Sequence, residues 1–291
     1  MNITVNGNEY IYLIILSSIM IAFLTMHKYY SLRSNNNIYG LNIETFSDFY
    51  TGNREFQEDS AGVLFLDKGI MAVLADGHGK NKIGKICSQL VVKIFEDMFK
   101  SEKSISNTKY FFKKTFNIAN REILKALDDK SGGTSVVSAI IKNNKLYYGS
   151  VGNTRICLFR NNELIPLNEG HTVDVIAKKR FKEGKIPKHY AQWALENKNI
   201  FNYIGQDEFK NIEINNIPIK MKKDDIIVLM SDGIYNFVPS TILEDYLSRH
   251  RLLSCKEISK KIIEYLDNLS IRGKDNGSII LIKYKSNILR V

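Results

Sequence analysis

The sequence predicts an α+β domain with β-sheets in the middle and helices outside. Two observations carry this prediction: short apolar runs rich in Val, Ile and aromatic residues occur in clusters, and longer segments with helical spacing are grouped between them. The 291 residues are 44% hydrophobic and 25% charged, a composition typical of globular rather than disordered proteins. Because no Pro-rich or Gly/Ser-rich linker divides the roughly 250 residues after the N-terminal segment, we expect one domain.

The N-terminal segment is predicted to be a single transmembrane helix. Residues 10–26 carry no charge, and a run of about 17 apolar residues is near the short limit for crossing a bilayer. A secretory signal peptide would have Lys or Arg before this run, whereas residues 1–9 contain neither. His27, Lys28 and Arg33 follow the run, so the positive-inside rule places the remainder in the cytoplasm.

These observations divide the chain into four parts. We expect a short extracytoplasmic N-terminus at residues 1–9, the transmembrane anchor at 10–26, a tether at 27–42 and the folded domain at 43–285. The predicted location is therefore the cell membrane, with a single span and a cytoplasmic domain. The alternative for residues 10–26 is a buried helix of the domain itself.

Seven apolar runs predict β-strands, because each is short, rich in β-branched or aromatic residues and bounded by turn residues. They are residues 62–66, 70–75, 134–141, 146–151, 155–159, 226–230 and 278–284. The polar intervals at 142–145 and 160–163 are compact and Asn-rich, which is typical of hairpin turns. We therefore expect the strands that they join to pair antiparallel.

Three segments predict helices, because apolar residues recur in them every three or four positions. The first contains Ile83, Ile86, Leu90, Ile94 and Met98, the second extends over residues 108–127, and the third contains Ile258, Ile262, Leu266 and Leu269.

The formal net charge of +10 is compatible with binding to nucleic acid or to an anionic membrane surface. However, the lysines are spread along the chain, and clusters such as residues 178–180 are short and lack interleaved aromatic residues. We therefore expect a solvated basic surface and no nucleic-acid partner. Cys87, Cys157 and Cys255 lack the paired spacing of zinc sites and disulfide frameworks, which favours buried thiols in a reducing compartment.

Acidic residues stand where apolar runs begin or end. Glu58 and Asp59 precede the 62–66 run, Asp76 follows the 70–75 run, Asp232 follows the 226–230 run, and Asp275 precedes the 278–284 run. A buried carboxylate is costly unless it has a partner. Any one Asp-Gly pair is most often only a turn, but several carboxylates at separate strand ends predict a site for Mg²⁺ or Mn²⁺, which prefer oxygen ligands.

The motifs RxxxEDS, ADGHGK, GGTS, GNTR, SDG and KDN occur in this order between residues 46 and 284. This series resembles the metal-dependent (type 2C) protein serine/threonine phosphatases over nearly the whole chain. The resemblance implies a central antiparallel β-sandwich flanked by helices, with two divalent cations, manganese or magnesium, at one end. It also implies hydrolysis of phosphoserine and phosphothreonine in phosphorylated proteins by a water or hydroxide that bridges the two metals.

The resemblance also implies the metal ligands. Asp76 corresponds to the carboxylate that bridges the two metals, and the carbonyl oxygen of Gly77 is a further ligand. Glu58 would complete one metal site, whereas Asp232 and Asp275 would belong to the other.

Three further residues receive catalytic roles from the resemblance. Asp59 orients bound water, and His78 is the general acid that protonates the leaving serine or threonine oxygen. Arg54 matches the family's phosphate-binding arginine, and a guanidinium suits this role because it is always charged and binds two phosphate oxygens at once.

The sequence departs from the family at Asn153, where many relatives have an aspartate that helps to hold a third, weaker metal. Asparagine keeps an oxygen but loses the charge, so we expect weaker third-site binding. Two alternatives remain open: a catalytically weak pseudophosphatase that binds phosphoproteins, and a two-metal hydrolase of small phosphoesters. The complete set of acidic residues counts against the first, and Arg54 beside the acidic pair counts against the second.

Overall fold

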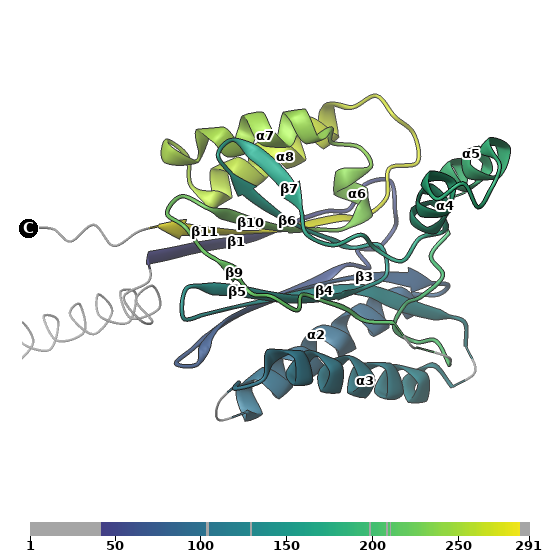
Figure 1. Ribbon diagram of the computed structural model, residues 1–291, viewed down its shortest axis with the longest axis horizontal. Coiled ribbons are helices and arrows are strands. Elements are labelled where there is room, and N and C mark those ends of the chain that lie inside the picture. The colour runs from purple at the N-terminus through teal and green to yellow at the C-terminus, as the bar shows by residue number, and fades with distance from the viewer. Residues whose placement is uncertain are drawn as a thin grey trace, which may run out of the picture.

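The computed structural model describes residues 42–102, 105–128, 130–197, 199–207, 209 and 211–285. Two antiparallel β-sheets face each other, and helices cover the outer face of each sheet (Figure 1). This arrangement confirms the predicted α+β class with sheets inside and helices outside.

One sheet has five strands in the order β1-β11-β10-β6-β7. Their bounds are β1 Asn42–Tyr50, β6 Arg155–Arg160, β7 Glu163–Pro166, β10 Ile226–Met230 and β11 Gly277–Lys285.

The other sheet has six strands, five of them in the order β2-β3-β4-β5-β8, with β9 also paired to β5. Their bounds are β2 Ser60–Leu66, β3 Gly69–Gly79, β4 Gly132–Lys142, β5 Lys145–Val151, β8 Glu213–Ile214 and β9 Ile219–Lys220.

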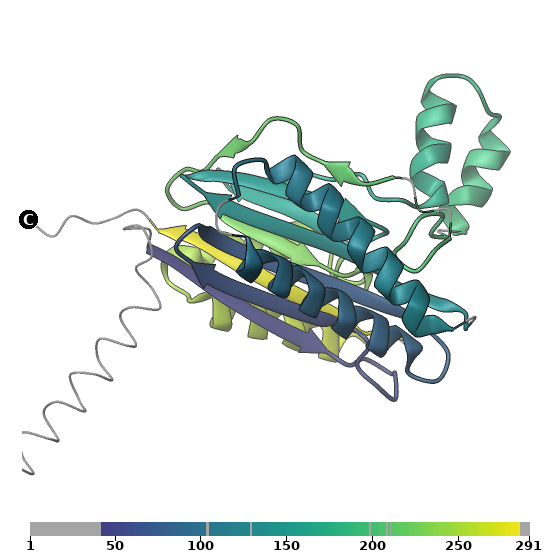
Figure 2. The same ribbon diagram turned by 90° about the horizontal axis from the view of Figure 1, so that it is seen from below.

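Six of the described α-helices fall into three groups (Figures 1 and 2). Helices α2 and α3 cover the six-stranded sheet, α7 and α8 cover the five-stranded sheet, and α4 and α5 form a hairpin that projects from one end of the molecule. The helix bounds are α2 Ile83–Ser101, α3 Thr108–Leu127, α4 Val173–Lys182, α5 Lys188–Glu196, α6 Asp232–Tyr235, α7 Ser240–Ser248 and α8 Cys255–Asn268, with a 3-10 turn at Arg249–Arg251.

Three apolar clusters hold these layers together. The middle cluster lies between the two sheets and includes Leu74 and Ile280. The second lies under α2 and α3, where the Phe95 and Phe116 rings meet edge to face with centroids 5.0 Å apart. The third joins the five-stranded sheet to α7 and α8. Cys87, Cys157 and Cys255 are buried in the second and third clusters.

The two predicted hairpins are confirmed, and asparagine explains their geometry. Asn143 and Asn144 have φ of 50° and 57°, and Asn161 and Asn162 have φ of 54° and 65°. Asparagine adopts this left-handed conformation more readily than most residues, and two such residues in succession match the twist of a tight hairpin. The turns therefore fix the antiparallel pairing of β4 with β5 and of β6 with β7.

Strand β1 was not predicted, because polar residues interrupt its alternation. Its Glu44 carboxylate accepts a hydrogen bond from the backbone N–H of Cys255 at 2.6 Å, and its Asp48 carboxylate accepts one from the Ser259 hydroxyl at 2.8 Å. Both donors belong to α8. The polar side chains of β1 are thus satisfied by a helix more than 200 positions away, which local sequence does not reveal.

The predicted N-terminus, the anchor at residues 10–26 and nearly all of the tether lie outside the described residues. Among the helices that the structure does describe, none is long and apolar enough to cross a bilayer.

Candidate metal centre

Four aspartates from both sheets come together at one end of the sandwich. Asp59 immediately precedes β2, Asp76 lies near the end of β3, Asp232 begins α6 directly after β10, and Asp275 lies two residues before β11. The first two belong to the six-stranded sheet and the other two to the five-stranded sheet. Burial is the largest cause that raises the pKa of Asp76 well above its ordinary value, and the negative charges of the other three aspartates raise it further.

Asp59 is a buried residue, with 5% of its surface exposed. Its Oδ2 accepts a hydrogen bond from the Ser231 hydroxyl at 2.8 Å, whereas its Oδ1 has no protein partner. Burial raises the pKa of Asp59 to about 7, and the charges of Asp232 and Asp275 contribute to the shift. A buried carboxylate oxygen without a donor is costly and would be relieved by a cation.

Asp76 and Asp232 share a side-chain hydrogen bond. This contact raises the pKa of Asp76 further, because it favours the protonated carboxyl group over the charged one. The other side of Asp232 is held by Asn153, whose Nδ2 donates to Oδ2 of Asp232 at 2.9 Å. Oδ1 of Asn153 has no protein partner, and the backbone carbonyl of Asn153 accepts a hydrogen bond from the Tyr235 hydroxyl at 2.7 Å.

Asp275 is engaged by Arg54 through two parallel hydrogen bonds. Nε of Arg54 donates to Oδ1 at 2.8 Å, and Nη2 donates to Oδ2 at 2.8 Å. The Arg54 side chain is 59% exposed and the Asp275 side chain 43% exposed. Exposed ion pairs contribute about 0–1 kcal/mol, so a phosphate or a cation can replace either partner at small cost.

Glu58 precedes β2 in the chain, but its side chain reaches the first turn of α2. There its carboxylate accepts a hydrogen bond from the backbone N–H of Lys85. An acidic side chain at this position satisfies a free N–H of the first helical turn and favours the positive end of the helix dipole. Its own backbone N–H donates to Oδ1 of Asn276 at 2.8 Å, which ties this loop to the loop of Asp275. Burial, the largest effect, raises the pKa of Glu58.

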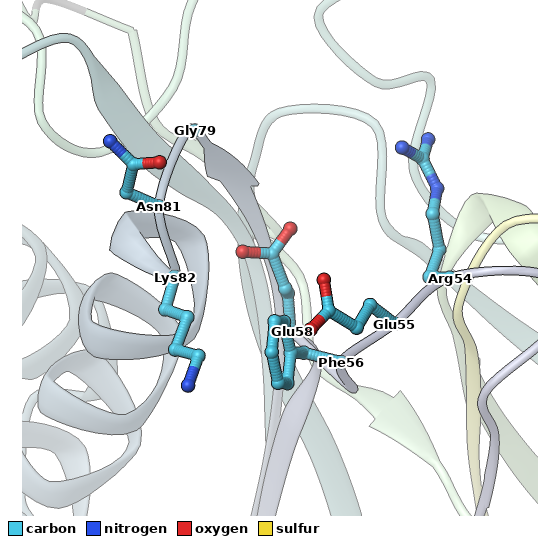
Figure 3. Close-up of a pocket in the computed structure, with 7 residues that line it drawn as sticks. All are labelled: Arg54, Glu55, Phe56, Glu58, Gly79, Asn81 and Lys82. Carbon is cyan, nitrogen blue, oxygen red and sulfur yellow. The ribbon is translucent and has the colours of Figure 1, made fainter.

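Glu58 also lines a pocket of about 590 Å³ beside the aspartates. In Figure 3, Glu58 and the Phe56 ring stand in the middle of this pocket, with Arg54 on one side and Lys82 on the other.

Gly77 follows Asp76 at the crossing of β3 and α2. A Cβ at this position would lie 2.1 Å from the carbonyl oxygen of Gly84 and 2.8 Å from that of Glu58. Only glycine allows the first turn of α2 to approach the strand so closely. The next residue, His78, packs its ring edge to face against Tyr203, with centroids 4.6 Å apart, and burial lowers the pKa of this histidine.

The donor set suits hard divalent cations, since it combines carboxylates with an unpartnered buried oxygen of Asp59. In the described residues, however, no group of three or more His, Cys, Asp or Glu side chains already has the spacing of a metal site. Two of the predicted ligands already have other partners. Asp275 is paired with Arg54, and Glu58 accepts a hydrogen bond from the backbone at the start of α2. The residues therefore fit the metals by type and charge. Metal binding would replace the contacts that Asp275 and Glu58 now make with Arg54 and with α2.

Comparison with known proteins identifies the same family as the motifs. The family model described as "Protein phosphatase 2C" matches residues 57–182. The chain is 26% identical over 238 residues to the serine/threonine phosphatase stp of Listeria monocytogenes, covering 79% of this chain and 91% of the relative. The resemblance to the type 2C phosphatases is confirmed.

Solved structures agree in fold. The serine/threonine phosphatase of S. agalactiae superimposes with a TM-score of 0.72 at 20% identity, covering 85% of this chain and all of that chain. The catalytic domain of the phosphatase PstP, whose structure contains two manganese ions, gives a TM-score of 0.65 at 21% identity, covering 84% and 99% of the two chains. At such identities these likenesses show a shared fold.

The fold brings together the four aspartates that the sequence analysis selected, and it places Arg54 beside Asp275. Two contributing residues were missed. The Ser231 hydroxyl donates to Asp59 and accepts the backbone N–H of Ser278 at 2.9 Å. The Asn276 side chain binds the loop of Glu58 and, through Nδ2, the carbonyl of Thr51 at 2.8 Å. Both residues lie inside the predicted motifs. Each is a polar residue next to a predicted ligand, and this was the only sign in the sequence that it contributes to the site.

Proposed function

We propose that the chain is a metal-dependent protein serine/threonine phosphatase. The observation that carries this proposal is the convergence of Asp59, Asp76, Asp232 and Asp275 from both sheets beside the exposed Arg54. The relatives named serine/threonine phosphatase and the family match support the same activity.

The proposed metals are two manganese or magnesium ions. Asp76, the carbonyl oxygen of Gly77, Asp232 and Asp275 would hold them, and Glu58 would join them by leaving the start of α2. When bound, the ions make water more acidic and offset negative charge on the phosphate. Support comes from the mutual repulsion of these carboxylates, which a cation would relieve, and from the two manganese ions in the PstP structure.

Arg54 binds the phosphate in this proposal. Its guanidinium already presents a two-pronged face to the carboxylate of Asp275, and the same face matches two oxygens of a phosphate. Because the existing ion pair is exposed, exchanging Asp275 for phosphate costs little. The departure of Arg54 also frees the Asp275 carboxylate for a cation, so phosphate binding and completion of the metal site favour each other.

His78 and Asp59 handle protons in this proposal. Only the protonated imidazole can act as the acid that gives a proton to the leaving serine or threonine oxygen, and burial lowers the pKa of His78, which disfavours this form in the free enzyme. The negative charge of a bound phosphate would favour its protonated form. Asp59, with one free oxygen, can accept a hydrogen bond from a water and orient it toward phosphorus.

The test is hydrolysis of a phosphothreonine peptide by the full chain in mild detergent with manganese. We expect Asp76→Asn and Asp232→Asn to reduce kcat/KM at least about 100-fold, because each removes a charge that the metals require. Asp97→Asn is the matched control, since Asp97 is an exposed aspartate on α2. Turnover that persists in both variants, or in the presence of a chelator, would refute the proposal.

The same assay separates the alternatives. A pseudophosphatase would bind the phosphopeptide without releasing phosphate at any metal concentration. A hydrolase of small phosphoesters would turn over p-nitrophenyl phosphate but would show no advantage for the phosphopeptide in kcat/KM.

We also propose that residues 10–26 anchor the protein in the cell membrane, with the folded domain in the cytoplasm. The uncharged run and the following His27, Lys28 and Arg33 support this topology. Protease added to intact cells should leave the domain intact and should cleave it after lysis. Recovery of the full chain in the soluble fraction without detergent would contradict the anchor.

A further inference from the structure

The pocket beside the metal centre has two charged residues that neither the metals nor the phosphate employs, Glu55 and Lys82. Lys82 lines the pocket together with Arg54 and Glu58. Its ammonium nitrogen lies 4.1 Å from the centroid of the Phe56 ring. A cation over an aromatic face is held in place while its N–H groups stay available to an acceptor.

The backbone fixes the direction of this lysine. Lys82 has a left-handed φ of 66°, and Asn81 before it has a φ of 54°. Such conformations cost non-glycine residues about 1–3 kcal/mol and persist where the surroundings determine them. Here the close contact between Gly77 and Gly84 holds the turn on both sides. Lys82 is therefore presented from a rigid turn rather than from a mobile loop.

The charges around the pocket separate into two sides. Glu55 is also on the pocket wall, but Figure 3 shows the Phe56 ring between its carboxylate and the Lys82 ammonium. Among the described residues, no ion pair with a carboxylate accompanies the contact of Lys82 with Phe56. The Lys82 side of the pocket is thus positive and exposed to solvent, and it lies across the pocket from Arg54, which would hold the phosphate.

We infer that Lys82 and Phe56 form a substrate subsite for an acidic side chain near the phosphorylated residue of the peptide. This inference rests on the proposed phosphatase function and adds a substrate class to it. The acidic group is a carboxylate or a second phosphate, because both supply oxygen acceptors to the ammonium. The Phe56 ring packs against the apolar part of the same side chain.

The experiment compares phosphothreonine peptides in which a glutamate or a phosphoserine replaces alanine at each flanking position in turn. We expect one position at which the acidic residue raises kcat/KM about threefold to fivefold, the effect of a partly exposed ion pair. The doubly charged phosphoserine should give the larger gain if phosphate is the preferred group, and equal gains would identify a general acidic subsite. Raising the salt concentration should reduce both gains.

Variants at position 82 decide the assignment. Lys82→Gly removes the side chain and suits the left-handed φ, so it should fold and lose the acidic preference. Lys82→Arg should keep the preference, and Lys82→Glu should invert it in favour of a lysine in the peptide. Lys80→Ala is the matched control, because Lys80 is an exposed lysine in the same turn that does not line the pocket.

An acidic preference that is identical in the parent and Lys82→Gly would overturn the subsite, as would the lack of any preference in the parent. Either result would leave peptide turnover intact, and the proposed function with it. Absence of turnover for every peptide would instead reject the proposed function. The subsite would then be tested by binding. The Kd values of the acidic and alanine peptides for the parent and for Lys82→Gly would be compared by fluorescence polarisation.

Discussion

Replacing Asp59 by asparagine should stabilise the metal-free protein at alkaline pH. Asp59 is 5% exposed, and burial raises its pKa from 3.8 to about 7. Because the folded state holds the Asp59 proton more tightly than the unfolded state, the parent loses stability as pH rises through this range. From these two pKa values, the penalty is about 2 kcal/mol at pH 5 and about 4 kcal/mol at pH 8.

The asparagine variant has no such penalty, but its amide leaves one buried polar group to be satisfied, at a cost of about 1–3 kcal/mol. That cost does not depend on pH. The difference in unfolding free energy between variant and parent should therefore grow in favour of the variant by about 2–3 kcal/mol from pH 5 to pH 8. For a domain of this size, the relative Tm shifts by about 5–10 °C.

The measurement is denaturation of the full chain in mild detergent with a chelator, followed by circular dichroism at both pH values. Asp67→Asn, at an exposed aspartate of the β2–β3 turn, is the control and should show no change of this size. Added manganese should reverse the order at pH 8 by stabilising the parent more than the variant. A stability difference that is equal at the two pH values would refute the electrostatic reasoning.

Three further changes test other parts of the structure. Asp225→Ala should cost about 3–5 kcal/mol in a denaturation experiment, because Asp225 is 1% exposed and its removal leaves Arg160 without its two-pronged partner; a loss below 1 kcal/mol would contradict a buried pair. Gly77→Ala should reduce soluble expression and activity together, since its Cβ would lie 2.1 Å from the Gly84 carbonyl oxygen; a fully active variant would show that α2 can move away freely. Asn153→Asp should lower metal-free stability by about 1–2 kcal/mol through added repulsion, and should shift the manganese dependence of activity to lower concentrations. Identical manganese curves for the Asn153→Asp variant and the parent would count against a role for this position in metal binding.

The sequence predicted the parts of the fold that local chemistry determines. The Asn-Asn turns and the β-branched runs are local signals, and strand β10 has the predicted bounds of residues 226–230. Strand β1 and helix α8 depend on each other through Glu44 and Asp48. No local pattern could identify such a pairing, because its hydrogen bonds join residues 211 positions apart.

The candidate site was predictable in composition but not in its pairings. Strand-end positions identified Asp59, Asp76, Asp232 and Asp275, since a carboxylate at such a place needs a partner. The two-pronged contact between Arg54 and Asp275 joins residues 221 positions apart. Motif order does not say which loop end meets which, so this contact could not be predicted. The contact of Glu58 with the start of α2 could not be predicted either, because it depends on how closely that helix approaches β3.

The pairing of β1 with β11 determines how the protein can be handled. Asn42 is opposite Lys285, and Tyr50 is opposite Gly277, so both outer ends of these strands lie at one end of the sandwich while the aspartates lie at the other. Nine residues of strand separate them by about 26 Å. A bead, fluorophore or fusion partner attached before β1 or after β11 would thus be held away from the aspartates of the metal centre. Protein immobilised on a surface through either of these ends would therefore keep its metal centre accessible to substrates in solution.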